Sequence, residues 1–229
     1  MRTAGIIAGL GPLAGAYFYR RLIELTPAHR DEDHIPVILL SSPQIPSRIA
    51  HLEHRGPSPL PALIHAAQIL VQAGAEFLVM PSSTTHAYYD ALSQAVSVPW
   101  LNMLTVVSDT IASHGIHRLA IMATTPTVQY HLYDSHLLAR QITPVLPDAT
   151  SQMDIMNIIE RVKGQDDLVA LGQALYEIAQ RPWSATADGL LLACTEIPVV
   201  FPVASWNQPA IFSATDILAQ HTAAWSSLS

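Results

Sequence analysis

Cysteine is almost absent from this chain, since Cys194 is the only one among 229 residues. A single cysteine cannot form a disulfide within the chain, so nothing indicates an oxidising compartment. Lysine is equally rare, because Lys163 stands alone beside ten arginines. Long apolar runs are missing too, and no stretch approaches the roughly 18 residues that a membrane-spanning helix needs. We therefore expect a cytoplasmic protein without a membrane segment.

Charged residues are also scarce, at 13% of the chain, and the formal net charge is −7. Nucleic acids and anionic membranes are bound by concentrated basic surface, which this composition does not offer. Half of the residues are hydrophobic, which excludes disorder and is enough to bury one large core or two smaller ones. The composition therefore favours a protein that binds or converts a small molecule.

Strand-like and helix-like segments alternate along the chain. The expected strands are 6–8, 36–41, 77–80, 119–123, 142–146 and 190–193, and the expected helices are 17–25, 63–73, 87–96, 105–114, 129–140, 155–163, 168–180 and 214–225. A proline- and serine-rich loop is expected over 42–61, and an irregular stretch up to Pro209. Alternating strands and helices predict parallel βαβ units. We expect an α/β fold of two similar parallel-sheet lobes, 1–98 completed by a C-terminal helical segment 207–229, and 99–206.

Two strand ends carry the same local pattern. The apolar run 190–193 leads directly into Cys194, and the run 77–80 leads into Ser82. A glycine turn at Gly9 and a threonine turn at Thr124 precede them at similar distances, which indicates an internal repeat. Ligands of α/β proteins bind at the carboxyl ends of strands. We therefore expect a site in a cleft between two lobes related by pseudo-twofold symmetry.

These motifs resemble the cofactor-independent aspartate/glutamate racemases, over nearly the whole chain. The resemblance rests on Ala8-Gly9-Leu10-Gly11-Pro12, Pro46-Ser47-Arg48, Ala123-Thr124-Thr125-Pro126-Thr127 with Tyr130, Lys163-Gly164 and Cys194-Thr195-Glu196. The last motif is the most specific of these. The family usually has Cys-Asn-Thr in its first lobe, where this chain has Ser82-Ser83-Thr84 followed by His86.

The resemblance implies a racemase of aspartate and/or glutamate that uses neither pyridoxal phosphate nor a metal, and forms a homodimer. Such an enzyme removes and returns the Cα proton on opposite faces, which assigns catalysis to Cys194, Ser82 and His86. It also implies that the substrate is bound by the following residues: Arg48, Lys163, Gly9, Ser83, Thr84, Thr124, Thr127, Thr195 and Glu196. Because only Cys194 is a thiol, the enzyme could be restricted to the L-enantiomer.

The chemistry explains why the serine matters. The pKa of a thiol is about 8.5 and can be tuned toward the operating pH, so a thiol can serve as acid or base. A serine hydroxyl is too weak an acid to be a resting base without an activating partner. Ser82 therefore either relays a proton through water or His86, or is a polar turn residue. His86 in turn either activates Ser82 or packs locally.

Other candidates have structural alternatives. Arg48 offers a bidentate fork to a substrate carboxylate, but it could be a solvated loop residue. Lys163 offers a point charge to a carboxylate, but it could be an exposed lysine at a helix end that interacts favourably with the helix dipole. Cys194 could be an inert buried cysteine, and the threonines could be ordinary turn caps. Glycines 9, 11 and 15 only approach a dinucleotide fingerprint, and the histidine pairs 51/54 and 131/136 lack a third metal ligand.

Two further functions stay open. A decarboxylase or isomerase of a small dicarboxylate needs a proton donor on only one face, which a single thiol provides. A non-catalytic dicarboxylate-binding protein would keep Arg48 and Lys163 without turnover.

Overall fold

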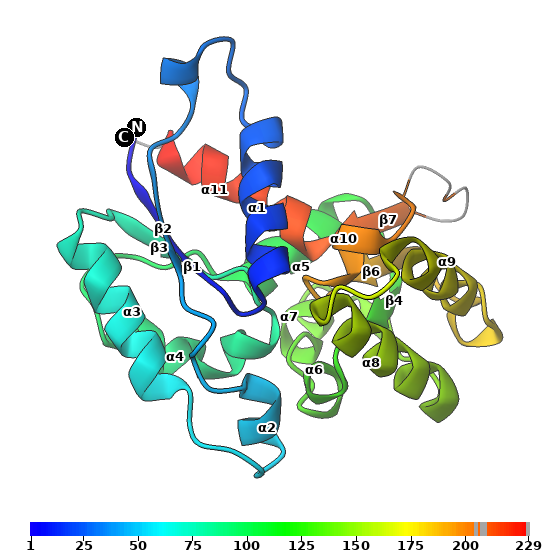
Figure 1. Ribbon diagram of the computed structural model, residues 1–229. Helices are drawn as coiled ribbons and strands as arrows, with labels where there is room; N and C mark the ends of the chain where they lie inside the picture. The colour runs from blue at the N-terminus through cyan, green and yellow to red at the C-terminus, as the bar shows by residue number, and fades with distance from the viewer. Residues whose placement is uncertain (204–205, 207–209, 228–229) are drawn as a thin grey trace. The chain divides into compact units, whose positions relative to one another are not determined.

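The computed structural model describes residues 1–203, 206 and 210–227 (Figure 1). The chain divides into two compact units, the first comprising Met1–Val106 with Asp216–Ser229 and the second Val107–Thr215. Both divisions lie beyond the expected ones, and the second does so because the strand Ala210–Ser213 pairs with Gly189–Leu192 within the second unit. The irregular stretch expected up to Pro209 and the start of the 207–229 segment fall partly outside the described residues.

The first unit alternates strands and helices as the sequence predicts. Its elements are β1 (Ala4–Ala8), α1 (Pro12–Leu25), η1 (Asp31–Asp33), β2 (Val37–Ser41), α2 (Arg48–Leu52), α3 (Leu60–Gln72), β3 (Phe77–Val79), η2 (Thr84–Tyr88) and α4 (Tyr89–Gln94). Helix α5 (Met103–Ser113) crosses into the second unit, and α11 (Ala214–Ser226) returns to the first.

The first sheet is parallel, in the order β2-β1-β3. Register is fixed by pairs such as Ala4 with Val37 and Ala4 with Phe77, and Leu78 forms an isolated parallel bridge with Trp100. Strand β1 is buried along its whole length, as expected for the centre of a parallel sheet. Helix α3 packs on this sheet and, with it, buries a core that includes Ile7, Leu63, Leu70, Leu78 and Trp100.

The C-terminal helix α11 is tied to the first strand region. The Arg2 guanidinium donates to the Trp225 carbonyl at 2.6 Å, and the Arg2 main-chain N–H donates to the Ser226 carbonyl at 2.8 Å. Arg21 of α1 forms an ion pair with Asp216 at 2.9 Å. Within the first unit, the beginning of the chain therefore lies beside the end of α11 (Figure 1).

The second unit repeats the pattern. Its elements are β4 (Arg118–Met122), α6 (Thr125–Gln129), α7 (Asp134–Leu138), β5 (Thr143–Val145), α8 (Ala149–Lys163), α9 (Leu168–Ala179), η3 (Pro182–Ser184), β6 (Gly189–Leu192), α10 (Ile197–Val200) and β7 (Ala210–Ser213).

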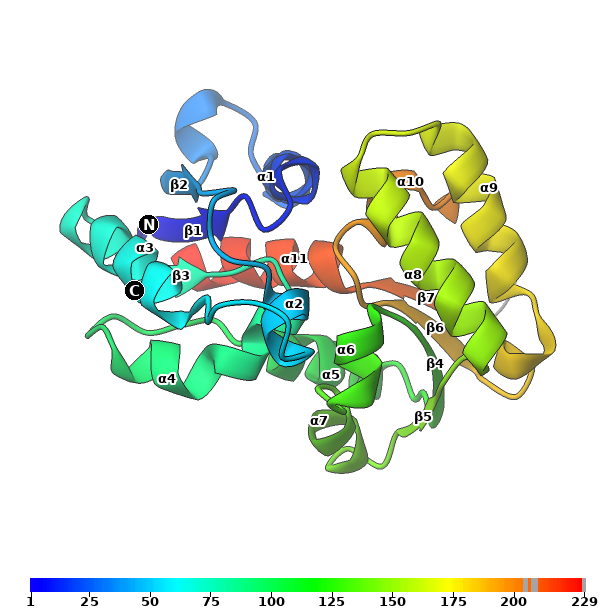
Figure 2. The ribbon, with the colours of Figure 1, turned by 60° about the horizontal axis from the view of Figure 1, so that its bottom comes forward.

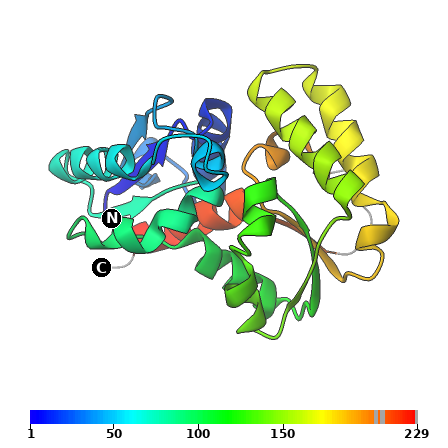
Figure 3. The same cartoon turned by 90° about the horizontal axis from the view of Figure 1, so that it is seen from below.

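The second sheet is also parallel, in the order β5-β4-β6-β7. Helices α8 and α9 pack against each other and lie side by side in two views (Figures 2 and 3). In each unit the first strand lies between the second and the third. Ser82 and Cys194 therefore follow corresponding strands, β3 and β6, as the internal repeat predicts.

The structure differs from the expected elements in several places. The 42–61 loop contains α2, which Ser47 caps by accepting from the Ala50 N–H. Of the expected helix 129–140 only α7 forms, because α6 already ends at Gln129 and His131 between the two has a left-handed φ of 52°. Strand β7 lies between the stretch expected to be irregular and the last expected helix, where no strand was expected, because its four residues are too short a run to be recognised without its partner β6.

Within the described residues, every helix is too short or too polar to span a bilayer.

Candidate functional site

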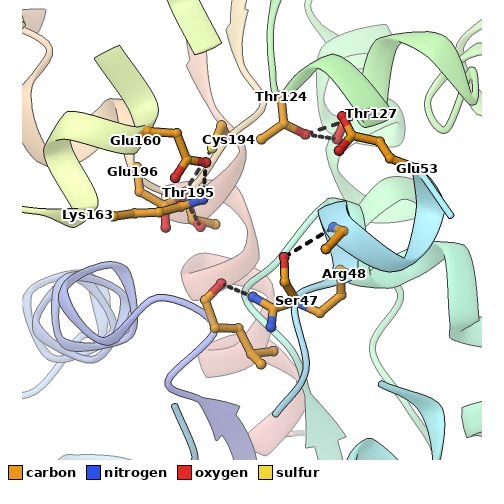
Figure 4. A network of polar contacts seen from close by, with 12 residues as sticks. Ser47, Arg48, Glu53, Thr124, Thr127, Glu160, Lys163, Cys194, Thr195 and Glu196 are labelled. Atoms are coloured by element: carbon orange, nitrogen blue, oxygen red, sulfur yellow. Dashed lines mark hydrogen bonds and ion pairs between the residues drawn. The ribbon is translucent and has the colours of Figure 1, made fainter. Parts of the chain in front are cut away.

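The second unit carries its candidate chemistry on the turn that follows strand β6. Cys194, Thr195 and Glu196 are 6%, 4% and 4% exposed. The turn is held to the neighbouring strand, because the Ala193 N–H donates to the Met122 carbonyl at 2.8 Å. A buried thiol, hydroxyl and carboxylate therefore share one turn at the carboxyl end of a parallel strand (Figure 4).

The Glu196 carboxylate is hydrogen-bonded to both neighbours in the motif. The Cys194 thiol donates to Glu196 Oε2 at 3.0 Å, and the Thr195 hydroxyl donates to the same oxygen at 3.3 Å. The other oxygen, Oε1, is buried without a hydrogen-bond partner among the described residues. The thiol and the carboxylate are thus in direct contact, and the protonated sulfur is the donor of their hydrogen bond.

The surroundings of Cys194 favour the neutral thiol. Burial raises its pKa well above the ordinary value, and the charge and hydrogen bond of Glu196 raise it further, while Lys163 and the Glu196 main-chain N–H act in the opposite direction. Desolvation disfavours the thiolate, and a neighbouring carboxylate repels it. Cys194 is therefore a proton donor at neutral pH unless another group takes its proton.

Lys163 lies in the last turn of α8, and its side chain is 31% exposed. Its ammonium donates to Glu160 Oε1 at 3.0 Å. Partial burial lowers its pKa, but Glu196, Cys194 and Glu160 together raise it above the ordinary value. Figure 4 shows the ammonium close to Glu160 and to the Cys194–Glu196 turn. The lysine is therefore a stable positive charge beside the thiol.

The threonine turn follows strand β4 in the same unit. Thr124 caps helix α6 by accepting from the Thr127 N–H at 3.4 Å, and the two hydroxyls lie 2.9 Å apart (Figure 4). Both residues are buried, at 4% and 3% exposure. The capping alternative is thus realised by Thr124.

In the first unit, Ser82 follows strand β3 and is buried. Its hydroxyl lies 2.6 Å from the Thr85 hydroxyl, and its main-chain N–H donates to the Met80 carbonyl at 2.8 Å. Ser82 is therefore paired with a neutral hydroxyl, whereas Cys194 is paired with a carboxylate.

The His86 ring is engaged with main-chain groups on both sides. Its Nε2 accepts from the Met103 N–H at 3.0 Å, and its Nδ1 lies 2.9 Å from the Ser82 carbonyl. Because Nε2 accepts, the proton of the neutral ring is on Nδ1, which donates to that carbonyl. The ring also stacks on Tyr89 at 5.8 Å. The hydrogen bond between His86 and Ser82 therefore joins the ring to the main-chain carbonyl of Ser82.

The neighbouring residues Ser83 and Thr84 are buried as well, at 3% and 8% exposure. The Ser83 hydroxyl donates to the Met103 sulfur at 3.8 Å. Together with Ser82 and Thr85 they form a continuous hydroxyl-bearing turn at the end of β3.

Arg48 begins helix α2 in the first unit. Its guanidinium donates to the carbonyls of Leu10, Ile45 and Pro46, at 2.6, 3.3 and 3.1 Å. These bonds join the 42–61 loop to the turn after β1, as Figure 4 shows for one of them. The arginine is therefore anchored by the loop and does not extend freely into solvent.

Gly9 lies in the same turn after β1, with a φ of +86°. A Cβ built there would lie 2.5 Å from the Ser42 nitrogen. The position therefore requires glycine, because of its positive φ and because a side chain would overlap the backbone at Ser42.

Two contributors were not anticipated from the sequence. Gln152 of α8 donates to the Ala123 carbonyl at 3.1 Å and the Thr125 hydroxyl at 3.3 Å, which supports the threonine turn. Thr85 pairs with Ser82. The signal for Thr85 was its spacing, because Ser82 and Thr85 are three residues apart, as are the paired Thr124 and Thr127. Gln152 had no such signal, since its contacts depend on how α8 packs.

In the part of the chain that the structure describes, no three His, Cys, Asp or Glu side chains converge on one point. His51 Nδ1 lies 2.7 Å from the Tyr88 hydroxyl, and His131 Nδ1 lies 2.8 Å from Asp134.

Comparison with known proteins identifies the family. A family model described as Asp/Glu/Hydantoin racemase matches residues 7–222. A broad specificity amino-acid racemase, RacX, from Bacillus subtilis (strain 168) is 28% identical over 216 residues, which cover 92% of each chain.

Solved structures have the same fold. The aspartate racemase of Picrophilus torridus superposes with a TM-score of 0.90 and 27% identity, over 99% of this chain and 94% of that one. An aspartate racemase homologue from Pyrococcus horikoshii OT3 has a TM-score of 0.78 at 22% identity, over the full length of both chains. With the family model spanning nearly the whole sequence, this chain belongs to the Asp/Glu/hydantoin racemase family and is an isomerase.

Proposed function

We propose that this chain racemises aspartate and/or glutamate without pyridoxal phosphate, by transferring a proton at Cα through Cys194. The observation that carries this proposal is the Cys194–Glu196 pair, a buried thiol hydrogen-bonded to a carboxylate at 3.0 Å. Thiols suit this reaction because they can both donate and accept a proton near neutral pH. The aspartate racemase and the broad-specificity racemase among the relatives support the reaction class.

Each substrate carboxylate needs a cation. We assign Lys163 and Arg48 to this role, because the ammonium is a point charge with a raised pKa and the guanidinium is a planar fork that matches a carboxylate. Hydroxyls and turn atoms would complete the binding of the substrate: Ser83, Thr84, Thr124, Thr127, Thr195 and Gly9.

Racemisation needs a group on each face of Cα. We assign Cys194 to one face and the Ser82 turn to the other, with His86 holding the Ser82 carbonyl. Because the Ser82 hydroxyl is paired with the neutral Thr85 hydroxyl and not with a base, Ser82 is the weaker acid-base group of the two. The proposal therefore includes a preference for the L-enantiomer, served by Cys194.

Chiral chromatography tests the function. The wild-type protein is incubated separately with L- and D-aspartate, L- and D-glutamate, and a set of neutral amino acids. We expect conversion of L-aspartate or L-glutamate, and its loss in Cys194→Ala. Conversion of none of them, by a folded protein that binds an acidic amino acid in calorimetry, would contradict the proposal. Carbon dioxide release from a malonate-type acid would then favour the decarboxylase, and binding alone the non-catalytic alternative.

A further inference from the structure

The protonated state of Cys194 creates a difficulty for the proposed reaction. A thiol that is buried and faces a carboxylate is neutral at physiological pH. A neutral thiol can give a proton to a Cα carbanion, but it cannot remove one. Reaction from the L-enantiomer therefore requires a second group that takes the thiol proton when the Cα proton arrives.

We propose that Glu196 is that group, a positioning residue that accepts the Cys194 proton as the sulfur accepts the Cα proton. This inference rests on the proposed function. In the forward step the Cα–H and S–H bonds break, a new S–H bond forms with the Cα proton, and the original thiol proton forms an O–H bond at Glu196 Oε2. In the reverse step Oε2 returns its proton to sulfur while sulfur protonates Cα.

The geometry selects Glu196 for this role. Its Oε2 already accepts the thiol hydrogen at 3.0 Å, so the proton moves along an existing hydrogen bond. The carboxylate is 4% exposed, which keeps bulk water from competing for the proton. The Thr195 hydroxyl donates to the same oxygen at 3.3 Å and holds it against the sulfur.

The charges also balance. Before the step, the thiol and the carboxylate carry one negative charge, which faces the Lys163 ammonium. After the step, both are neutral and the negative charge is on the substrate. Lys163 remains positive, because Glu196, Cys194 and Glu160 raise its pKa. The Lys163 ammonium therefore no longer faces a negative charge on the Cys194–Glu196 pair and can stabilise the carbanion. Opposite charges attract strongly in a buried site.

The titration of Cys194 tests this arrangement without any substrate. Because the chain has one cysteine, labelling with 13Cβ-cysteine gives a single thiol signal in NMR. In wild type we expect its midpoint above the ordinary value of about 8.5. In Glu196→Gln, loss of the carboxylate charge should lower the midpoint by about one pH unit or more, a tenfold change in thiolate fraction.

Glu160→Gln is the matched control. It removes the other carboxylate near Lys163. Because the thiol donates to Glu196, the shift in Glu160→Gln should be smaller than that in Glu196→Gln. Should Glu196→Gln fail to fold, Glu196→Asp moves the carboxylate away by one methylene and should give an intermediate midpoint. An unchanged midpoint in a folded Glu196 variant would overturn the proposal.

Activity gives the second readout. We expect Glu196→Gln to lower kcat on the L-enantiomer on the order of 10²-fold, the usual contribution of a proton-transfer partner, with partial rescue in Glu196→Asp and a shifted pH profile. A wild-type kcat and pH profile in Glu196→Gln would overturn the role. Absence of racemisation in wild type would instead defeat the proposed function, while the thiol titration would still report on the Cys194–Glu196 contact.

Discussion

Ser82 and Cys194 occupy corresponding positions after β3 and β6, but they have different partners. The Ser82 hydroxyl is paired with Thr85 at 2.6 Å, and the Cys194 thiol with Glu196 at 3.0 Å. A hydroxyl neighbour cannot take a proton from serine at neutral pH, whereas a carboxylate can take one from a thiol. The chemical asymmetry therefore includes the supporting residues as well as the reactive atoms.

Replacing Ser82 by cysteine tests this asymmetry. We expect Ser82→Cys to raise Cα proton exchange from the D-enantiomer on the order of 10²-fold, because a thiol is a far better acid-base group than a hydroxyl. Loss of the Cα proton signal of D-aspartate and D-glutamate in D2O, followed by 1H NMR, measures the gain, with Ser83→Cys as the control one residue away. An equal rate in Ser82→Cys and wild type, with both folded, would contradict the assignment of Ser82 to the second face.

Residue-level contacts were only partly predictable. The apolar runs before Ser82 and Cys194 identified both positions, because strands and the turns after them are local features. The bonds from His86 to Met103 and from Arg48 to Leu10 were not predictable, since they join residues that meet only in the folded chain. The same holds for the electrostatic effect of Glu196 on the pKa of Lys163, because the two residues belong to different elements.

At the scale of elements, several expected helices begin earlier than predicted, among them α1, α3 and α8. Asp148 caps α8 by accepting from the Ser151 N–H at 2.9 Å, and Pro12 starts α1 within the expected turn. Capping residues are polar and lie outside the apolar period, so periodicity alone places the helix start too late.

Close packing of α9 on α10 depends on a glycine. A Cβ at Gly172 would overlap the Val200 carbonyl, so we expect Gly172→Ala to lower the free energy of unfolding by about 1–3 kcal/mol, despite the better helix propensity of alanine. Gly164→Ala is the control, because its φ is ordinary and its nearest neighbour would be 3.4 Å away. Thermal denaturation compares them, and a Gly172→Ala protein as stable as wild type would show that the helices can separate without loss.

Asp188 joins the beginnings of β4 and β6. Its carboxylate accepts from the main-chain N–H groups of His117 and Arg118 at 2.9 and 2.7 Å. Although burial raises its pKa, these donors lower it below the ordinary value. A lowered folded-state pKa stabilises the protein above the unfolded value of about 3.9 and loses that contribution as the pH falls through the folded value.

We therefore expect Asp188→Ala to lower the Tm near pH 7, with the difference from wild type shrinking as the pH falls below about 4. Calorimetry across this pH range measures it. Asp188→Asn, which cannot titrate, is the control and should be less stable than wild type by an amount that also shrinks at low pH. A difference that is constant with pH would contradict the role of the Asp188 charge.

At the scale of the whole molecule, the chain is two units with the same strand order around β1 and β4. The repeat could be predicted because each half has its own apolar strands and polar turns. The division of the chain could be predicted only approximately, because strand β7 is short and its assignment depends on pairing with β6. The return of α11 to the first unit is secured by contacts between Arg2 and Trp225 that no local pattern reveals.

The central claim is that Cys194 transfers a proton at Cα of an acidic amino acid. Its most direct test is 1H NMR of L-aspartate and L-glutamate incubated with the protein in D2O, beside the D-enantiomers. We predict loss of the Cα proton signal from an L-enantiomer, faster than from its D-counterpart, and no loss with Cys194→Ser. Undiminished exchange in Cys194→Ser, or none of the four acids exchanging with the folded wild-type protein, would contradict the claim.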